Sequence, residues 1–273
     1  MEYKIVEGRV QTRALEYHII DHCNLRCNQC CSYSPFLKSW LCKPDQFETD
    51  LLRVKNCVQP TFLKIVGGEP LLHPDLPQLL EIAHKVGIAP KISVTTNGHL
   101  LDRLPEDSWK SFQMLTVSVY PDPQLGNEKI RWINAKAKEN NITVSWKIQD
   151  KFVNLNRETV ATYEEAKETY QGCWIHHRCN SIKGGRFYSC TRPQYLQKLA
   201  VNSEVFLEDG VELAAYDDET LPLMVLKHLQ SSEPIRACFV CKGGQSSLDT
   251  QRQLSPSEVK TEKNRLIELC KTI

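Results

Sequence analysis

Three cysteines near the N-terminus have a spacing that suits an iron–sulfur cluster with one open coordination position. Cys23, Cys27 and Cys30 follow the pattern C-x3-C-x2-C, directly after the apolar run 15–20. Three thiolates from one loop can hold three irons of a [4Fe–4S] cluster, which leaves the fourth iron for a small molecule. A structural zinc site would instead be closed by four ligands. Cys31 follows at once, but adjacent residues in a tight loop rarely reach the same metal, and we expect it to be a bystander.

A second segment, Gly67-Gly68-Glu69-Pro70, follows the strand-like run 62–66. Together, in this order and each after a strand, the two motifs resemble those of the radical S-adenosylmethionine (SAM) enzymes. The resemblance implies that the cysteine loop holds a [4Fe–4S] cluster. It also implies that the backbone and carboxylate of the glycine segment hold the methionine amino group of SAM. Gln29 departs from the family pattern, because the family usually has an aromatic residue before the third cysteine. In the family, the contact of this position with the adenine of SAM is mostly through the backbone, so another side chain can stand there.

Polar residues end the next strand-like runs. Thr96, Asn97 and Ser118 resemble positions where family members contact the ribose or carboxylate of SAM. For Asn97 the alternative is local, since Asn-Gly favours a tight turn by itself. Lys147 ends the following run and could pair with a carboxylate, but we expect it to be exposed.

A later group of cysteines predicts a second metal site. Cys173 and Cys190 flank Gly185 in a way that resembles the opening C-x9–15-G-x4-C of the SPASM/twitch accessory domain, with a β-hairpin at Gly184-Gly185. Cys238 and Cys241 add a C-x2-C pair. The resemblance implies one auxiliary [4Fe–4S] cluster held by Cys173, Cys190, Cys238 and Cys241, the truncated twitch arrangement. Zinc is the chemical alternative, since four thiolates also suit zinc.

Cys179 is the candidate catalytic residue. It could be an unligated thiol beside the auxiliary site, or replace Cys173 as a ligand, although its gap to Gly185 is shorter than the pattern. As a thiol facing the substrate it could donate a hydrogen atom. The isolated Cys42, Cys57 and Cys270 are expected to be apolar packing residues.

Strand-like and helix-like runs alternate along the first half of the chain, which predicts parallel strands joined by helical crossovers. The expected strands are 15–20, 62–66, 91–95, 115–119 and 142–148, and the expected helices are 44–58, 74–86 and 127–140. The pattern alone supports an α/β fold and does not separate a barrel from an open sheet. The family resemblance implies a partial (β/α)6 barrel, whose chemistry lies at the C-terminal ends of the strands.

The second half is expected to form a small twitch domain. Residues 154–170 are polar and predict a solvated helix or linker that closes the first domain. Ser255-Pro256-Ser257-Glu258 predicts a helix start with a capping box, and the helix runs to about Lys271. We therefore expect a radical SAM partial barrel over residues 1–165. An auxiliary iron–sulfur domain with a C-terminal helix would cover residues 166–273.

Composition and charge narrow the possible partners and location of the protein. Charged residues make up 25% of the 273 residues and the formal net charge is +1, so nothing favours a nucleic-acid partner or an anionic membrane. No run reaches the ~18 apolar residues that a membrane span needs, and the N-terminus lacks a signal-peptide pattern. We expect a cytoplasmic protein, in which twelve cysteines indicate metal rather than disulfides.

The resemblance also implies a reaction. SAM on the open iron accepts one electron from the reduced cluster, supplied by a reductant such as flavodoxin or ferredoxin, and gives a 5′-deoxyadenosyl radical. Relatives with a twitch domain include dehydrogenases and epimerases of cyclitols and sugars, and also peptide maturases. Residues 30–36 are similar to the carbohydrate-acting members. We therefore expect abstraction of hydrogen from a hydroxyl-bearing carbon of a sugar or cyclitol-like substrate, giving dehydrogenation or epimerisation.

Two alternatives stay open at this point. One is a radical SAM maturase of a ribosomal peptide, and the other is a non-catalytic zinc-binding interaction protein. The expected cofactors are two [4Fe–4S] clusters and SAM. Candidates for the general base are His22, Asp150 and Glu164, with Arg192 as an electrostatic aid only, since it is permanently protonated.

Overall fold

The computed structural model describes residues 3–200 and 203–273. Its strands are β1 (Ile5–Val6), β2 (Arg9–Ile20), β3 (Val58–Gly67), β4 (Ile92–Thr96), β5 (Met114–Val119), β6 (Thr143–Ile148), β7 (Lys151–Val153), β8 (Ser181–Lys183), β9 (Arg186–Tyr188), β10 (Gly210–Glu212) and β11 (Leu248–Thr250). Its α-helices are α1 (Pro44–Lys55), α2 (Leu76–Val86), α3 (Asn127–Glu139), α4 (Tyr163–Gly172), α5 (Pro193–Leu199), α6 (Thr220–Leu229) and α7 (Pro256–Lys271).

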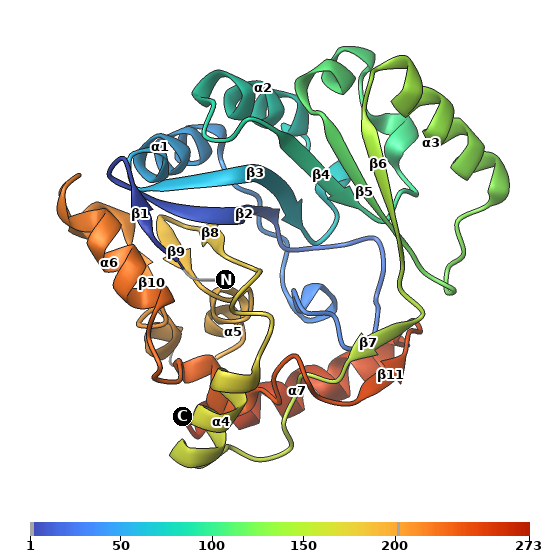
Figure 1. Cartoon of the computed structure of the whole chain (residues 1–273). Helices are drawn as coiled ribbons and strands as arrows, with labels where there is room; N and C mark the ends of the chain where they lie inside the picture. The colour runs from blue at the N-terminus through green and yellow to red at the C-terminus, as the bar shows by residue number, and fades with distance from the viewer. Residues whose placement is uncertain (1–2, 201–202) are drawn as a thin grey trace.

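The main sheet has the strand order β10-β9-β8-β2-β3-β4-β5-β6, with β1 added to β2. From β8 to β6 every neighbouring pair is parallel. Figure 1 shows the sheet curving, with α1, α2 and α3 on its outer face and β7, β11 and α7 across the open side. Among the described strands β6 and β10 end the sheet without pairing to each other. The expected partial barrel is confirmed.

Alternate residues of the central strands face two different environments, as the period of two in a strand requires. Leu15 and Tyr17 of β2 are fully buried in the apolar core shared with the outer helices. Glu16 and His18, between and after them, line a cavity on the inner face. On β3, Lys64 pairs in register with Glu16 and lines the same cavity. Glu16, His18 and Lys64 therefore point into the barrel.

The expected elements are present, but several boundaries were wrong. The helix expected at 44–58 ends at Lys55, because Val58 already pairs with Val10 in the sheet. The helix expected at 74–86 begins at Leu76. The strands expected at 15–20 and 62–66 begin earlier, at Arg9 and Val58. Their first residues alternate polar and apolar types, which hid the strand signal from a search for apolar runs. The remaining strands and α3 differ by one residue, which is ordinary.

The segment 154–170 is helical only in its last part. Helix α4 begins after Thr162, whose side chain accepts a hydrogen bond from the Glu165 backbone N–H while the Glu165 carboxylate accepts one from the Thr162 N–H. This capping box starts the helix, and its T-x-x-E signature was missed in the sequence. The boundary expected between residues 165 and 166 falls inside α4, and the division into two domains stays a prediction.

The second half of the chain extends the barrel sheet. The expected hairpin is confirmed: Gly184 and Gly185, at φ 57° and 75°, join β8 to β9. β8 then pairs in parallel with β2, Ser181 opposite Glu16. The capping box of α7 is also confirmed, with Ser255 as the N-cap. Cys270 is buried in an apolar cluster on this helix, as expected for a packing residue. None of the helices in the described part of the chain is long and apolar enough to cross a membrane.

Candidate active site

One cavity, of about 260 Å³, gathers residues from both predicted N-terminal motifs. It lies on the inner face of the barrel, toward the C-terminal ends of the parallel strands. The predicted site residues on its wall are Cys23, Cys27, Cys30, Gly67, Gly68, Glu69, Thr96, Asn97, Ser118 and Cys179. Pro70 is buried beside the cavity, where it starts a short 3-10 helix over Pro70–Leu72. The structure thus brings these side chains together from four separate strand ends and from the segment before β8.

Gly67 and Gly68 let the end of β3 approach the cysteine loop closely. The Gly68 N–H donates to the Ile20 carbonyl at 2.8 Å, and the Glu69 N–H donates to the His22 carbonyl at 3.0 Å. A Cβ on Gly67, whose φ is 153°, would lie 2.4 Å from the Ile20 carbonyl oxygen. A Cβ on Gly68 would lie 2.0 Å from the His22 carbonyl oxygen. Since those contacts are with backbone, neither side chain can be accommodated without separating the two motifs.

Replacing Gly68 by alanine is therefore expected to cost about 2 kcal/mol or more in stability, and to weaken SAM binding, because the strand end must move away from the loop. Thermal unfolding and equilibrium dialysis with SAM would measure both effects. Gly126→Ala is the control, because a Cβ there meets nothing within 4 Å. It should cost at most about 1 kcal/mol, as for an exposed N-cap glycine. Equal effects of the two substitutions would contradict the close approach.

Glu69 is a buried carboxylate held entirely by uncharged donors. Only 1% of it is exposed. It accepts hydrogen bonds from the Thr96 hydroxyl at 2.6 Å, the Asn97 N–H at 2.8 Å and the Leu71 N–H at 3.2 Å. Burial raises the pKa of Glu69 to about 7. In the described residues no basic side chain forms an ion pair with it, so the site fits an ammonium group of a ligand.

Asn97 builds the local turn that the sequence offered as one of its two roles, and its contact with SAM stays a prediction. Its carbonyl oxygen accepts a hydrogen bond from the His99 N–H at 3.1 Å, which builds the turn. Its amide nitrogen donates to the Asn24 side chain at 2.8 Å and contacts the Cys23 sulfur at 3.8 Å. The turn after β4 is thereby tied to the cysteine loop, and its backbone N–H stays directed at Glu69.

The cysteines of the loop are suited to binding a metal cluster. Burial raises the pKa of Cys23, Cys27 and Cys30, so they keep their protons unless a metal replaces them. The Leu25 N–H donates to the Cys23 sulfur at 3.4 Å, as expected for a thiolate ligand. Cys31, expected to be a bystander, also lines the cavity.

The deeper part of the cavity holds a charged group that sequence reasoning missed. Lys64 donates to the Glu16 carboxylate at 2.9 Å, and the His18 Nε2 lies 3.5 Å from the other carboxylate oxygen. The His18 Nδ1 lies 2.6 Å from the Tyr195 hydroxyl. Burial by itself would raise the pKa of Glu16, but His18 and Lys64 outweigh it and lower that pKa to about 2. Glu16 is therefore a carboxylate at neutral pH, available to accept hydrogen bonds.

Cys179 lies between this charged group and the later cysteines. It lines the cavity with Glu16 and Lys64 and packs against the apolar cluster that contains Cys173 and Cys190. Burial, and then the charge of Glu16, raise the pKa of Cys179 well above its usual range. Its sulfur is therefore a protonated thiol, the form that can give up a hydrogen atom.

The expected base candidates are placed elsewhere. His22, Asp150 and Glu164 are not part of the cavity wall, and the His22 ring bonds to Ser39. Arg192 is buried beside the later cysteines and donates to Tyr33 and Asn156. The role of general base therefore stays untested for these residues, none of which lines the cavity. Lys147 is exposed, as expected, and lies on the rim of the cavity.

The later cysteines surround a second, enclosed pocket. Cys173, Cys190, Cys238 and Cys241 all line it, whereas Cys179 does not. The Gly244 N–H donates to the Cys173 sulfur at 3.2 Å, and the Gly243 N–H donates to the Cys241 sulfur at 3.3 Å. Among residues 3–200 and 203–273, no three His, Cys, Asp or Glu side chains form a group that could hold a single metal ion. A four-iron cluster holds its thiolates farther apart than one zinc ion does, and four cysteines around one pocket with N–H donors to sulfur fit it.

The chain is similar to several known proteins. The chain is similar to the GTP 3',8-cyclase of Aquifex aeolicus (strain VF5), at 31% identity over 123 residues, which cover 43% of this chain and 38% of the relative. It is also similar to GTP 3',8-cyclase 1 of Mycobacterium tuberculosis (strain ATCC 25618 / H37Rv), at 37% identity over 119 residues, which cover 38% of this chain and 31% of the relative. The chain thus spans well under half the length of either curated relative.

Among solved structures, native anSMEcpe with bound AdoMet has a TM-score of 0.50 at 13% identity, covering 94% of this chain and 96% of that one. BtrN in complex with AdoMet and 2-DOIA has a TM-score of 0.49 at 14% identity, and the match covers 86% of this chain and 94% of BtrN. The likeness to anSMEcpe concerns the fold. A family model described as the Radical SAM superfamily matches residues 17–168, more than half of the chain. The chain belongs to the radical SAM superfamily.

Proposed function

We propose that this enzyme abstracts a hydrogen atom from a hydroxyl-bearing carbon of a sugar or cyclitol-like substrate and returns one from Cys179, which gives an epimer. The observation that carries the proposal is the protonated Cys179 thiol on the wall of the cavity that also gathers the SAM-binding residues. The proposal includes a [4Fe–4S] cluster on Cys23, Cys27 and Cys30. A second cluster would be held by Cys173, Cys190, Cys238 and Cys241.

The chain's own residues bind and orient the cofactor. SAM and the first cluster, when bound, supply a 5′-deoxyadenosyl radical. Glu69 would bind the SAM amino group, and Thr96 and Asn97 hold that carboxylate in place. Ser118, at the end of β5, lines the same cavity and would bind the ribose or carboxylate. Burial of this wall excludes water, which a reactive radical requires.

The deeper wall suits a polyhydroxylated ring. Glu16 is ionised and can accept a hydrogen bond from a hydroxyl, and Lys64 beside it can donate to a hydroxyl oxygen. Ser32, Ser34 and Thr191 add hydroxyl groups to the same wall. Such a lining recognises a sugar or cyclitol better than an apolar peptide side chain.

The Cys179 thiol would return the hydrogen atom in one homolytic step. The Cys179 S–H bond breaks homolytically, its hydrogen atom forms the new C–H bond, and a thiyl radical remains on sulfur. One electron from an external reductant such as flavodoxin or ferredoxin, together with one proton, restores the thiol. If the hydrogen atom arrives on the face opposite the one that lost its hydrogen, the configuration at that carbon is inverted.

Dehydrogenation is a second candidate, favoured by the position of Cys179 against the auxiliary cysteines. Cys173, Cys190, Cys238 and Cys241 would hold the auxiliary cluster, which could accept the one electron that the substrate radical must lose. Glu16 would then take the hydroxyl proton as the carbonyl forms.

The test uses anaerobically reconstituted protein with dithionite and SAM in D2O. The panel contains myo-inositol, the aminoglycoside neamine, UDP-N-acetylglucosamine and a mixed peptide library. We expect 5′-deoxyadenosine, and a carbohydrate product that has gained one deuterium at carbon. Loss of two hydrogens would indicate dehydrogenation instead, and a modified peptide would indicate a maturase. Zinc without iron or sulfide, and no 5′-deoxyadenosine, would overturn the proposal.

The raised pKa of Glu69 predicts a pH dependence of SAM binding. Below its pKa of about 7 a proton competes with the SAM ammonium for the carboxylate, so affinity should fall with decreasing pH, by about tenfold for each unit. Dialysis of SAM at pH values on both sides of this pKa would measure it. 5′-Methylthioadenosine, which lacks the amino group, is the control and should bind equally throughout. A flat profile for SAM would contradict the assigned partner.

A further inference from the structure

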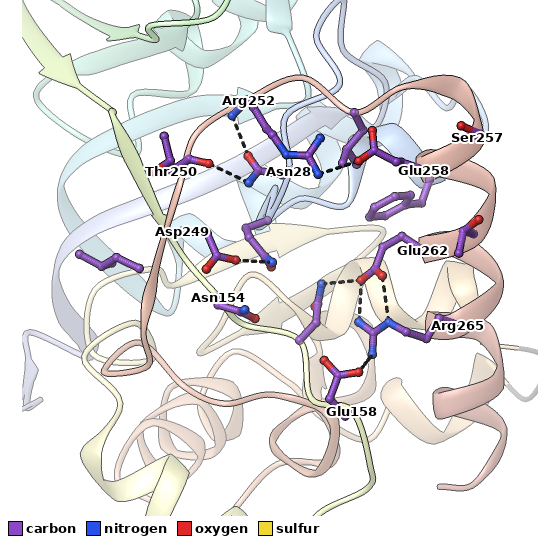
Figure 2. Close-up of a pocket in the computed structure, with 16 residues that line it drawn as sticks. Asn28, Asn154, Glu158, Asp249, Thr250, Arg252, Ser257, Glu258, Glu262 and Arg265 are labelled. Carbon is purple, nitrogen blue, oxygen red and sulfur yellow. Dashed lines mark hydrogen bonds and ion pairs between the residues drawn. The ribbon is translucent and has the colours of Figure 1, made fainter.

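The segment that follows the auxiliary cysteines returns to the loop of the first cluster. After β11, the Leu254 N–H donates to the Arg26 carbonyl at 2.7 Å, and the Asn28 N–H donates to the Arg252 carbonyl at 3.0 Å. Figure 2 shows the Asn28 side chain bonded to Thr250 and Arg252, beside an open groove of about 950 Å³ that reaches to α7. Residues 26–29 of the loop of the first cluster are therefore paired with the segment 248–254.

Two glutamines of this segment point at one cluster cysteine. The Nε2 atoms of Gln251 and Gln253 each lie 3.3 Å from the Cys27 sulfur. Each Nε2 also donates to the Asp122 carbonyl at 2.7 Å. Both N–H groups of each amide are therefore engaged, one on sulfur and one on a backbone carbonyl.

The orientation of both amides follows from their other contacts. The Gln251 Oε1 accepts a hydrogen bond from the Asp122 N–H at 3.2 Å, and the Gln253 Oε1 accepts one from the Arg26 N–H at 2.6 Å. Rotating either amide by half a turn would place its oxygen against the sulfur and the Asp122 carbonyl, and its nitrogen against a donor. The N–H end of each amide therefore faces Cys27.

Donors at a cysteine sulfur change the energy of the cluster that the sulfur binds. Reduction adds negative charge to the cluster and its thiolates. An N–H donor stabilises that charge, so it favours the reduced form and raises the reduction potential. Gln251 is 2% exposed, and water competes little with such a bond in a buried site.

We propose that Gln251 and Gln253 are positioning residues that raise the reduction potential of the cluster on Cys23, Cys27 and Cys30. The chain shortly before this segment contacts the other cysteine group, because the Gly243 and Gly244 N–H groups donate to the sulfurs of Cys241 and Cys173. The inference rests on the first cluster of the proposed function and not on the identity of the substrate.

The test compares the full-length loaded protein with Gln251→Leu, Gln253→Leu and the double variant. Redox titration followed by electron paramagnetic resonance would give each midpoint potential, and the signal that changes on adding SAM identifies the first cluster. We expect a lower potential in each single variant and a further decrease in the double variant, with unchanged iron content. Arg252→Lys is the matched control: it lies between the glutamines, its side chain bonds to Glu258 and the Gln253 carbonyl and not to sulfur, and lysine keeps the charge, so the potential should stay at the wild-type value.

A measurement on the wild-type protein covers the case in which a leucine variant loses its cluster. After exchange into D2O, hyperfine spectroscopy of the reduced first cluster should detect strongly coupled deuterons. The isosteric Gln251→Glu and Gln253→Glu variants should lose part of this coupling. Unchanged potentials, or couplings equal in the wild type and both glutamate variants, would overturn the inference while leaving the proposed function intact. Absence of any SAM-responsive cluster in the wild type would overturn both.

Discussion

Glu69→Gln is expected to weaken SAM binding by at least about 30-fold, because removing one partner of a buried charge-assisted pair costs about 2–5 kcal/mol. The substitution conserves shape, and the remaining oxygen can still accept from the Thr96 hydroxyl. The new amide nitrogen, however, faces the Asn97 N–H in place of an acceptor. It also carries no charge for the SAM ammonium.

Dialysis of labelled SAM against the reconstituted variant measures the change. The rate of 5′-deoxyadenosine formation at low SAM should fall by a similar factor and recover partly when SAM is raised. Glu81→Gln, on the exposed face of α2, is the control and should bind SAM as the wild type does. If Glu69→Gln binds SAM normally, the amino group is held elsewhere.

Cys179→Ala is expected to separate SAM cleavage from product formation. Formation of 5′-deoxyadenosine should stay within about threefold of the wild type, because Glu69 and the three cysteines of the loop are untouched. The epimerised product should fall by at least about 100-fold, since no hydrogen donor remains and the substrate radical is lost to other reactions. Mass spectrometry of the product formed in D2O, with 5′-deoxyadenosine quantified in parallel, would show both.

Two control variants, Cys57→Ala and Cys173→Ala, test whether the loss of product comes from the missing Cys179 thiol. Cys57→Ala removes a fully buried cysteine of the barrel core and should cost stability without changing the ratio of product to 5′-deoxyadenosine. Iron content should be unchanged in Cys179→Ala and reduced in Cys173→Ala, which separates a hydrogen donor from a ligand. Full product yield from Cys179→Ala would remove the epimerisation mechanism, and a ketone product would then support dehydrogenation.

The fold was predictable because its signal is local and repeated. Strands and helices alternate along the chain, and each apolar run becomes one parallel strand. The errors occurred where the local signal is ambiguous. Val58 continues the apolar pattern of α1 but belongs to β3, and Thr162 starts α4 inside a polar segment that looked like a linker.

The segments proposed to bind the cofactor could be located in the sequence, because each lies within one loop or one strand end, and the structure brings them to one cavity. The deeper wall of the cavity was not. Glu16 and Lys64 meet through the register of two parallel strands separated by a helical crossover. Which face of each strand turns inward depends on the curvature of the whole sheet. The sequence could not rank the candidates for the general base for the same reason.

The sequence by itself determined the family and the two segments proposed to start its reaction. The spacing of Cys23, Cys27 and Cys30, and the two glycines before Glu69, are short-range features whose geometry follows from a single turn of chain. The tertiary structure decided what surrounds them. Cys179 reaches the cavity because β8 pairs with β2, and Gln251 reaches the Cys27 sulfur across 224 residues of sequence. Contacts of that range depend on how the sheet curves and where the chain returns, which no local pattern encodes.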